Sequence, residues 1–121
     1  MEQKNIDLKN LLKHFADDQE ILLEVMSRYL ALYPQFLQNI NQALEQKNSK
    51  ELVAAAHSLK GSVSHFFVVD IFSELSEIED CGNKDDFELA NVKMSQLLPK
   101  LDSLNKELVL YVEGTFDAKA D

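Results

Sequence analysis

Three residues near the middle of the chain, His57, Lys60 and Gly61, have the types and spacing needed for phosphoryl transfer. A neutral imidazole offers a nucleophilic nitrogen near pH 7, and it can attack an acyl phosphate that a partner presents. A lysine three residues further along a helix lies beside the histidine, where its ammonium can offset phosphoryl charge. We therefore expect a labile phosphoryl group on His57, with the outer Nε2 as the acceptor atom.

The apolar residues of the segment 52–66 recur with helical spacing, which predicts a helix with one buried face. That face holds Leu52, Ala56, Leu59, Val63 and Phe66. At 3.6 residues per turn, His57 lies roughly 150° from the centre of this face, so it is expected to point to solvent. The residues within about 60° of it on the same wheel form one exposed stripe, which holds Lys50, Val53, Lys60, Gly61 and Ser64.

Gly61 is expected on the exposed side of this helix, one turn after His57. A glycine inside a helix costs roughly 0.5–1 kcal/mol relative to alanine. Core packing does not require it at an exposed position. Such a glycine is explained if another molecule must come very close to the helix beside the histidine.

The elements that must position this helix are also predicted to be helices. The 121 residues fit one domain, and the low numbers of glycine (3) and proline (2) disfavour strands joined by tight turns. Helical periodicity covers residues 6–15, 19–48, 50–66, 70–82 and 86–112. Pro34 marks either a kink in one long helix or a break and restart, and Pro99 is expected to kink the last helix.

Capping residues mark the expected helix ends. The expected starts are Asp17 or Asp18, Ser49, Asp70, and Asp85 or Asp86, and the expected ends are Asn48 and Gly82-Asn83. The predicted fold is all-α, an antiparallel up-and-down four-helix bundle with a short additional N-terminal helix over one end. We expect one domain over residues 1–121, with the bundle over about 6–112 and a polar tail over about 113–121.

Charge and composition exclude several classes of function. The formal net charge is −9, from 12 basic and 21 acidic residues, which disfavours binding to nucleic acid or to an anionic membrane. No apolar run approaches the roughly 20 residues of a membrane span, and the N-terminus has no signal-peptide pattern. The single cysteine, Cys81, cannot form an internal disulfide. A reducing, cytoplasmic setting and a monomer are expected, either as a freestanding protein or as a domain of a hybrid kinase.

The segment Ala56-His57-Ser58-Leu59-Lys60-Gly61-Ser62 is similar to the A-H-x-L-K-G signature of the histidine-containing phosphotransfer (HPt) family. The stretch 17–22 and the residues Leu75, Ile78 and Glu79 resemble the helical framework of that family, so the resemblance covers roughly residues 8–110. It implies that His57 is the phosphoacceptor, that Lys60 supports the phosphoryl group and that Gly61 lets a receiver domain approach.

The resemblance also implies a function. HPt proteins shuttle phosphoryl groups between receiver-domain aspartates in multistep phosphorelays, or accept them in chemotaxis-type kinases. The implied partners are receiver domains of response regulators and of hybrid histidine kinases. The chain would be a phosphocarrier without kinase activity or cofactor, with Mg²⁺ only in the partner receiver domain. The sequence itself has no glycine-rich phosphate loop.

Two further expectations concern the face around His57. The residues expected to dock a partner are Lys50, Val53, Ser58, Ser64 and His65. Because its exposed stripe holds two lysines, this face should be neutral to basic and fit an acidic receiver pocket. The family usually has a glycine where the helix ends after the histidine, and this sequence has Phe67 there; one interpretation is a different helix end with extra core.

Other functions are weaker alternatives. A non-catalytic adaptor would bind a receiver or kinase through the same face without being phosphorylated, and a helical subunit would assemble through the bundle surface. A di-iron site needs a glutamate three residues before a histidine, and none of His14, His57 and His65 has one. No acid–base partner stands at useful spacing from Ser58, Ser62 or Ser64, so a hydrolase triad is unsupported.

Overall fold

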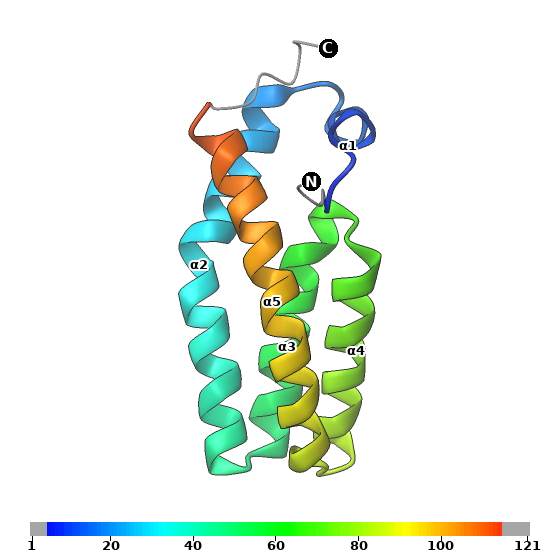
Figure 1. The fold of residues 1–121 in the computed structure, drawn as a ribbon, viewed down its shortest axis with the longest axis vertical. Coiled ribbons are helices and arrows are strands. Elements are labelled where there is room, and N and C mark those ends of the chain that lie inside the picture. Colours follow the sequence, from blue (N-terminus) through cyan, green and yellow to red (C-terminus); the bar gives the residue numbers. More distant parts are fainter. Residues whose placement is uncertain (1–4, 115–121) are drawn as a thin grey trace.

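The computed structural model describes residues 5–114, and all its regular elements are helices. They are α1 (Leu8–His14), α2 (Gln19–Gln46), α3 (Ser49–Val63), a 3-10 turn η1 (Ser64–Phe66), α4 (Val69–Asn83) and α5 (Phe87–Val112). Figure 1 shows the long helices α2 to α5 side by side along the long axis. The fold is therefore a helical bundle, as the periodicity predicted.

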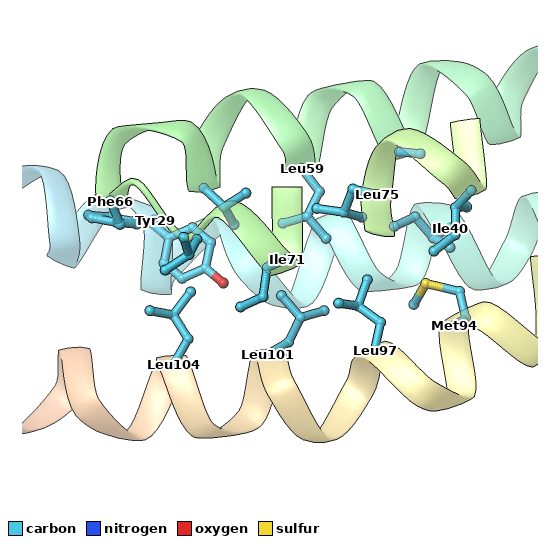
Figure 2. Close-up of a cluster of buried hydrophobic side chains, with 14 of the residues drawn as sticks. Tyr29, Ile40, Leu59, Phe66, Ile71, Leu75, Met94, Leu97, Leu101 and Leu104 are labelled. Carbon is cyan, nitrogen blue, oxygen red and sulfur yellow. The ribbon is translucent and has the colours of Figure 1, made fainter. Parts of the chain in front are cut away.

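The apolar stripe of each long helix faces a common core. Helix α2 packs against α3 and α5, and α4 packs against the same two helices. Figure 2 shows Ile40, Leu59, Leu75 and Leu97, one from each long helix, meeting between the ribbons, and each is fully buried. At one end of the core the Tyr29 ring packs edge-on against Phe66, with 5.4 Å between ring centroids.

Side-chain caps set most of the helix starts. Asp18, Asn48 and Asp86 each accept a hydrogen bond from the backbone N–H three residues later, which satisfies a donor that the helix leaves unpaired. Asp18 and Asp86 agree with the sequence prediction.

Three predicted caps were wrong: Ser49 and Asp70 as helix starts and Asn48 as a helix end. Asn48 begins α3 where Ser49 was expected, and the end of α2 falls on Lys47, which adopts the left-handed conformation (φ 52°). Asp70 lies in the first turn of α4 and does not cap it, because the cap position is Val68, which has no side-chain hydrogen bond. An acidic first turn still opposes the positive end of the helix dipole.

Both prolines lie inside continuous helices. Helix α2 runs through Pro34 and α5 runs through Pro99, so a break and restart at Pro34 is excluded. Both prolines are exposed, so the carbonyl left without its usual N–H partner can turn to water.

Helix α1 covers the end of the bundle where α3 turns into α4 (Figure 1). Ile6 and Leu11 bury their side chains there. The buried carboxylate of Glu107 on α5 accepts a hydrogen bond of 2.7 Å from the backbone N–H of Asn5. The Asn5 side chain donates to Ser103 at 3.1 Å. These contacts fix the chain before α1 on the bundle, as a stable short helix requires.

Of the predicted polar tail, Glu113 and Gly114 form a turn after α5, and residues 115–121 lie outside the described part of the chain. None of the helices within residues 5–114 is long and apolar enough to cross a membrane.

Candidate phosphoacceptor site on α3 and α4

The buried face of α3 directs His57 outward. Ala56 and Leu59, on either side of it in the sequence, are fully buried, whereas the His57 side chain is 69% exposed. The imidazole is therefore accessible to another molecule, as the helical wheel predicted. It is not free of contacts, because α4 packs along one flank of α3.

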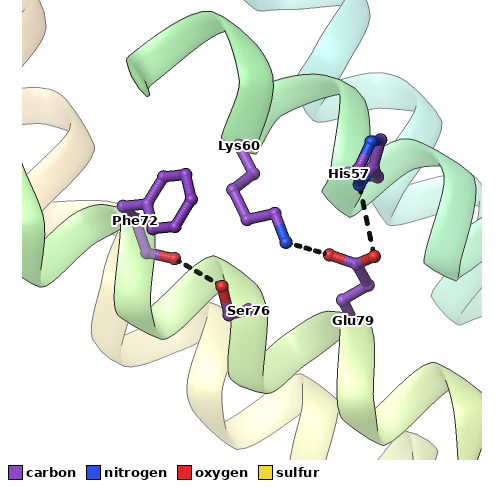
Figure 3. Close-up of polar contacts among 5 residues, drawn as sticks. All are labelled: His57, Lys60, Phe72, Ser76 and Glu79. Atoms are coloured by element: carbon purple, nitrogen blue, oxygen red, sulfur yellow. Dashed lines mark hydrogen bonds and ion pairs between the residues drawn. The ribbon is translucent and has the colours of Figure 1, made fainter.

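Glu79 on α4 bridges the two candidate residues of α3. Its Oε2 lies 3.3 Å from Nδ1 of His57, and its Oε1 lies 2.6 Å from Nζ of Lys60. Figure 3 shows the carboxylate between the imidazole and the ammonium. A carboxylate only accepts hydrogen bonds, so this contact favours the tautomer with the proton on Nδ1. Nε2 then carries the lone pair.

The Lys60 side chain is more buried than the helical wheel predicted. Its side chain is only 18% exposed, and Nζ lies 5.4 Å from the centroid of the Phe72 ring on α4. The ammonium is thus held between an aromatic face and a carboxylate. The sequence prediction of a fully exposed stripe was wrong for Lys60, because α4 covers that flank of α3.

Val53 is also partly covered on this flank, where α3 and α4 approach closely. A Cβ placed on Gly82 of α4 would lie 2.8 Å from Cγ2 of Val53, so the missing side chain of Gly82 lets the two helices approach closely. Val53 is half-buried in this contact. Much of its surface already packs against α4, so only part of the side chain is left for the predicted contact with a partner.

Gly61 has the opposite environment to Gly82. It is exposed, and a Cβ added to it would meet no heavy atom within 4 Å. Nothing inside the fold requires a glycine there. Its small size leaves open surface one turn from His57, on the same side of α3.

Comparison with protein-family models gives a match to the Hpt domain over residues 24–108, more than two thirds of the chain. This chain belongs to the Hpt domain family. Hpt domains carry out histidine phosphotransfer in two-component phosphorelays, and their partners are receiver domains of response regulators or kinases. The matched region runs from α2 into α5 and includes His57, Lys60, Gly61 and Glu79. No curated protein and no solved structure gives a match.

This Hpt domain places the remaining predicted docking residues on the outer side of α3 and in η1. Lys50, Ser58, Ser64 and His65 are all exposed. The Ser64 hydroxyl donates to the carbonyl of Gly61. Lys50 lies seven residues before His57, roughly 10 Å along the helix, so the structure does not bring it into the Glu79 cluster.

Phe67 ends the 3-10 turn after α3 in the left-handed conformation, with φ 55° and ψ 38°. Glycine adopts this conformation without strain, whereas for a bulky side chain it is an outlier. The backbone of this Hpt domain therefore turns here in a conformation that suits glycine, although a phenylalanine occupies the position. Phe67 does not extend the core here, because its side chain is 56% exposed.

Sequence reasoning placed Glu79 in the family framework and missed its contacts with the site. A signal was present, because Leu75, Ile78 and Gly82 mark the buried face of α4 and Glu79 stands at its edge. The sequence does not show which helix faces that edge. Phe72, three residues before Leu75 on α4, is 39% exposed and lies beneath Lys60.

Other reactive groups do not form a second centre within residues 5–114. No group of three His, Cys, Asp or Glu side chains there is placed to hold a metal ion. Burial raises the pKa of the Cys81 thiol, and Asp86 adds to this shift. A protonated, buried thiol is a poor nucleophile, so Cys81 serves packing at the end of α4.

Proposed function

We propose that this chain is a phosphorelay carrier that accepts a phosphoryl group on Nε2 of His57 from one receiver-domain aspartate and donates it to another. The observation that carries this proposal is the Glu79 bridge to His57 and Lys60. It gives an exposed imidazole a defined tautomer and places a cation beside it. An exposed histidine without such support would have no reason to be oriented.

The phosphoryl group passes directly between the two proteins, and no further reactant is consumed. The Nε2 lone pair attacks phosphorus of the receiver acyl phosphate, an N–P bond forms, and the P–O bond to the aspartate breaks. The aspartate leaves as a carboxylate, and the proton stays on Nδ1, so the phosphorylated ring is an imidazolium. Glu79 faces that new positive charge at Nδ1 and stabilises it.

Lys60 and Gly61 have separate roles in this proposal. Lys60 fixes the other oxygen of Glu79, and its ammonium offsets the charge of the phosphoryl group as it arrives. Gly61 leaves room for the receiver to bring its aspartate to Nε2. The reverse reaction uses the same groups, because the phosphorylated nitrogen is a good leaving group for an incoming carboxylate.

Several finer points of the proposal follow from the family and the composition. The partners would be receiver domains of response regulators and of hybrid histidine kinases, contacting Ser58, Ser64 and His65 around the acceptor. The chain would act as a cytoplasmic monomer without kinase activity or cofactor, with Mg²⁺ held by the receiver. We also propose the antiparallel up-and-down arrangement of α2 to α5, which the short connections and Figure 1 support.

Transfer from a phosphorylated receiver domain, followed by intact-protein mass, tests the proposal. Wild type should gain one acid-labile phosphoryl group, and His57→Gln should gain none. His14→Gln is the matched control, because His14 is an exposed histidine of α1 outside the proposed docking residues, and it should be labelled like wild type. If no receiver in a broad panel labels wild type while binding persists, the chain is an adaptor and the carrier proposal fails.

A further inference from the structure

An exposed apolar patch lies at the turn from α3 to α4. Phe67, Val69 and Phe72, called the Phe67 patch below, are 56%, 74% and 39% exposed. Val69 and Phe72 stand three residues apart on α4 and so share one face of the helix. Three large apolar side chains exposed within six residues are a feature that the fold itself does not need.

Phe67 is the member of the patch whose backbone is strained. Its left-handed backbone (φ 55°) is strained for a bulky residue, and strain of this kind points to a function when it is observed. Its ring contacts His14 of α1, with 4.4 Å between ring centroids, yet more than half of the side chain remains exposed. A glycine would make the same turn without strain.

The patch is continuous with the phosphoacceptor site. The Phe72 ring lies 5.4 Å from Nζ of Lys60, Lys60 pairs with Glu79, and Glu79 contacts His57 (Figure 3). The last six residues of α3 after His57, followed by the 3-10 turn η1, place Phe67 roughly 15 Å from His57 along the axis of α3. A protein interface of standard size covers about 800 Å² of each partner, equivalent to a disc about 16 Å in radius. A partner centred on His57 would therefore reach Phe67.

We propose that the Phe67 patch is a docking surface for the receiver domain, and that the receiver presents apolar side chains there next to its phosphorylated aspartate. This inference rests on the proposed phosphotransfer function and adds where the partner sits: over α3 and the start of α4. Phe67 acts as the anchor. An aromatic side chain contributes large contact area at low entropic cost, which gives a reason for keeping it in a strained position.

Transfer from a phosphorylated receiver to the full chain tests this proposal, with the initial rate measured against receiver concentration. Phe67→Gly should raise the half-saturating receiver concentration by about tenfold, the typical effect of losing an anchor residue. Val69→Ser should raise it to a smaller extent. Val92→Ser is the matched control, because Val92 is an exposed helical valine (48%) on α5, and it should behave like wild type.

A small phosphodonor separates this proposal from the proposed function. Phosphoramidate needs no docking surface, so it should phosphorylate His57 of Phe67→Gly at the wild-type rate. If Phe67→Gly takes phosphoryl groups from the receiver with unchanged concentration dependence, the docking proposal fails while the carrier function stands. If wild type is labelled by neither donor, the carrier function itself fails.

The Phe67 patch could instead anchor α1 or bind a second copy of the chain, and two further measurements distinguish these roles from receiver docking. His14→Ala removes the ring contact but keeps Phe67. If it weakens transfer as much as Phe67→Gly, the phenylalanine acts by anchoring α1, and direct docking is overturned. If wild type sediments as a dimer and Phe67→Gly as a monomer, the patch binds a second copy of the chain, which also overturns the receiver assignment.

Discussion

Nδ1 of His57 on α3 lies 3.3 Å from Oε2 of Glu79 on α4, so the orientation of the candidate phosphoacceptor depends on a neighbouring helix. The other oxygen of the same carboxylate pairs with Lys60 of α3 at 2.6 Å. One residue of α4 thus connects the two residues of α3 that the proposed chemistry uses. This makes Glu79 a positioning residue with a role that can be measured.

Glu79→Ala should slow phosphorylation of His57 by about tenfold to a hundredfold, because a hydrogen bond to a charged group contributes roughly 1.5–3 kcal/mol. The imidazole should also lose its preference for the Nδ1–H tautomer, which ¹⁵N NMR of the histidine ring nitrogens reports. Glu77→Ala is the control, since Glu77 is an exposed glutamate of α4. A slowed reaction with an unchanged tautomer ratio would show that Glu79 acts only by holding the helices together.

Gly61→Ala should stabilise the fold and slow transfer from a receiver. A Cβ there meets nothing within 4 Å, and alanine in place of a helical glycine adds about 0.5–1 kcal/mol to the free energy of unfolding. Gly82→Ala should instead lower that free energy by about 1–3 kcal/mol, because its Cβ would overlap Val53. Urea unfolding and receiver transfer measure the two effects, and a Gly61→Ala protein with wild-type transfer would remove the proposed reason for this glycine.

Leu97 and Leu98 offer a matched test of the core. Leu97 is fully buried and Leu98 is 38% exposed, although they are neighbours on α5. Leu97→Ala should lower the free energy of unfolding by about 2–5 kcal/mol, as expected for a deleted core side chain. Leu98→Ala should lower it by no more than about 1 kcal/mol. Equal losses in urea unfolding would contradict the orientation of α5.

The tyrosines predict a loss of stability at high pH. Burial raises the pKa values of Tyr29 and Tyr33, and burial with the nearby Glu107 raises that of Tyr111 to about 12. Unfolded phenols titrate near pH 10, so the native state holds these protons more tightly. Stability should be unaffected below about pH 10 and fall as the pH rises toward 12. Urea unfolding at pH 8 and pH 11 measures the change, and equal midpoints would contradict these shifts.

The helices and the exposed histidine could be predicted because both depend on local periodicity. The apolar spacing of residues 52–66 alone places His57 on the outer side of α3. Contacts between helices could not be predicted in the same way. The burial of Lys60 and Val53, and the reach of Glu79 to His57, depend on α4 lying along one particular flank of α3. The sequence of α3 does not specify that flank.

The backbone conformations at the helix ends could not be predicted from the sequence either. Asn48 and Ser49 are both good cap residues and stand side by side, and only the structure shows that Asn48 is the cap, because its side chain accepts a hydrogen bond from the backbone N–H of Glu51. Phe67 has no local preference for the conformation it adopts. Its strained backbone appears only in the structure.

A long-range ¹H–¹⁵N NMR spectrum of the phosphorylated chain tests whether His57 is the phosphoacceptor. The chain has three histidines, and only the ring-nitrogen signals of His57 should change on phosphorylation. Its Nε2 should carry phosphorus, and its Nδ1 should remain protonated beside Glu79. Phosphorylation on Nδ1, or on His14 or His65, would contradict the proposed site.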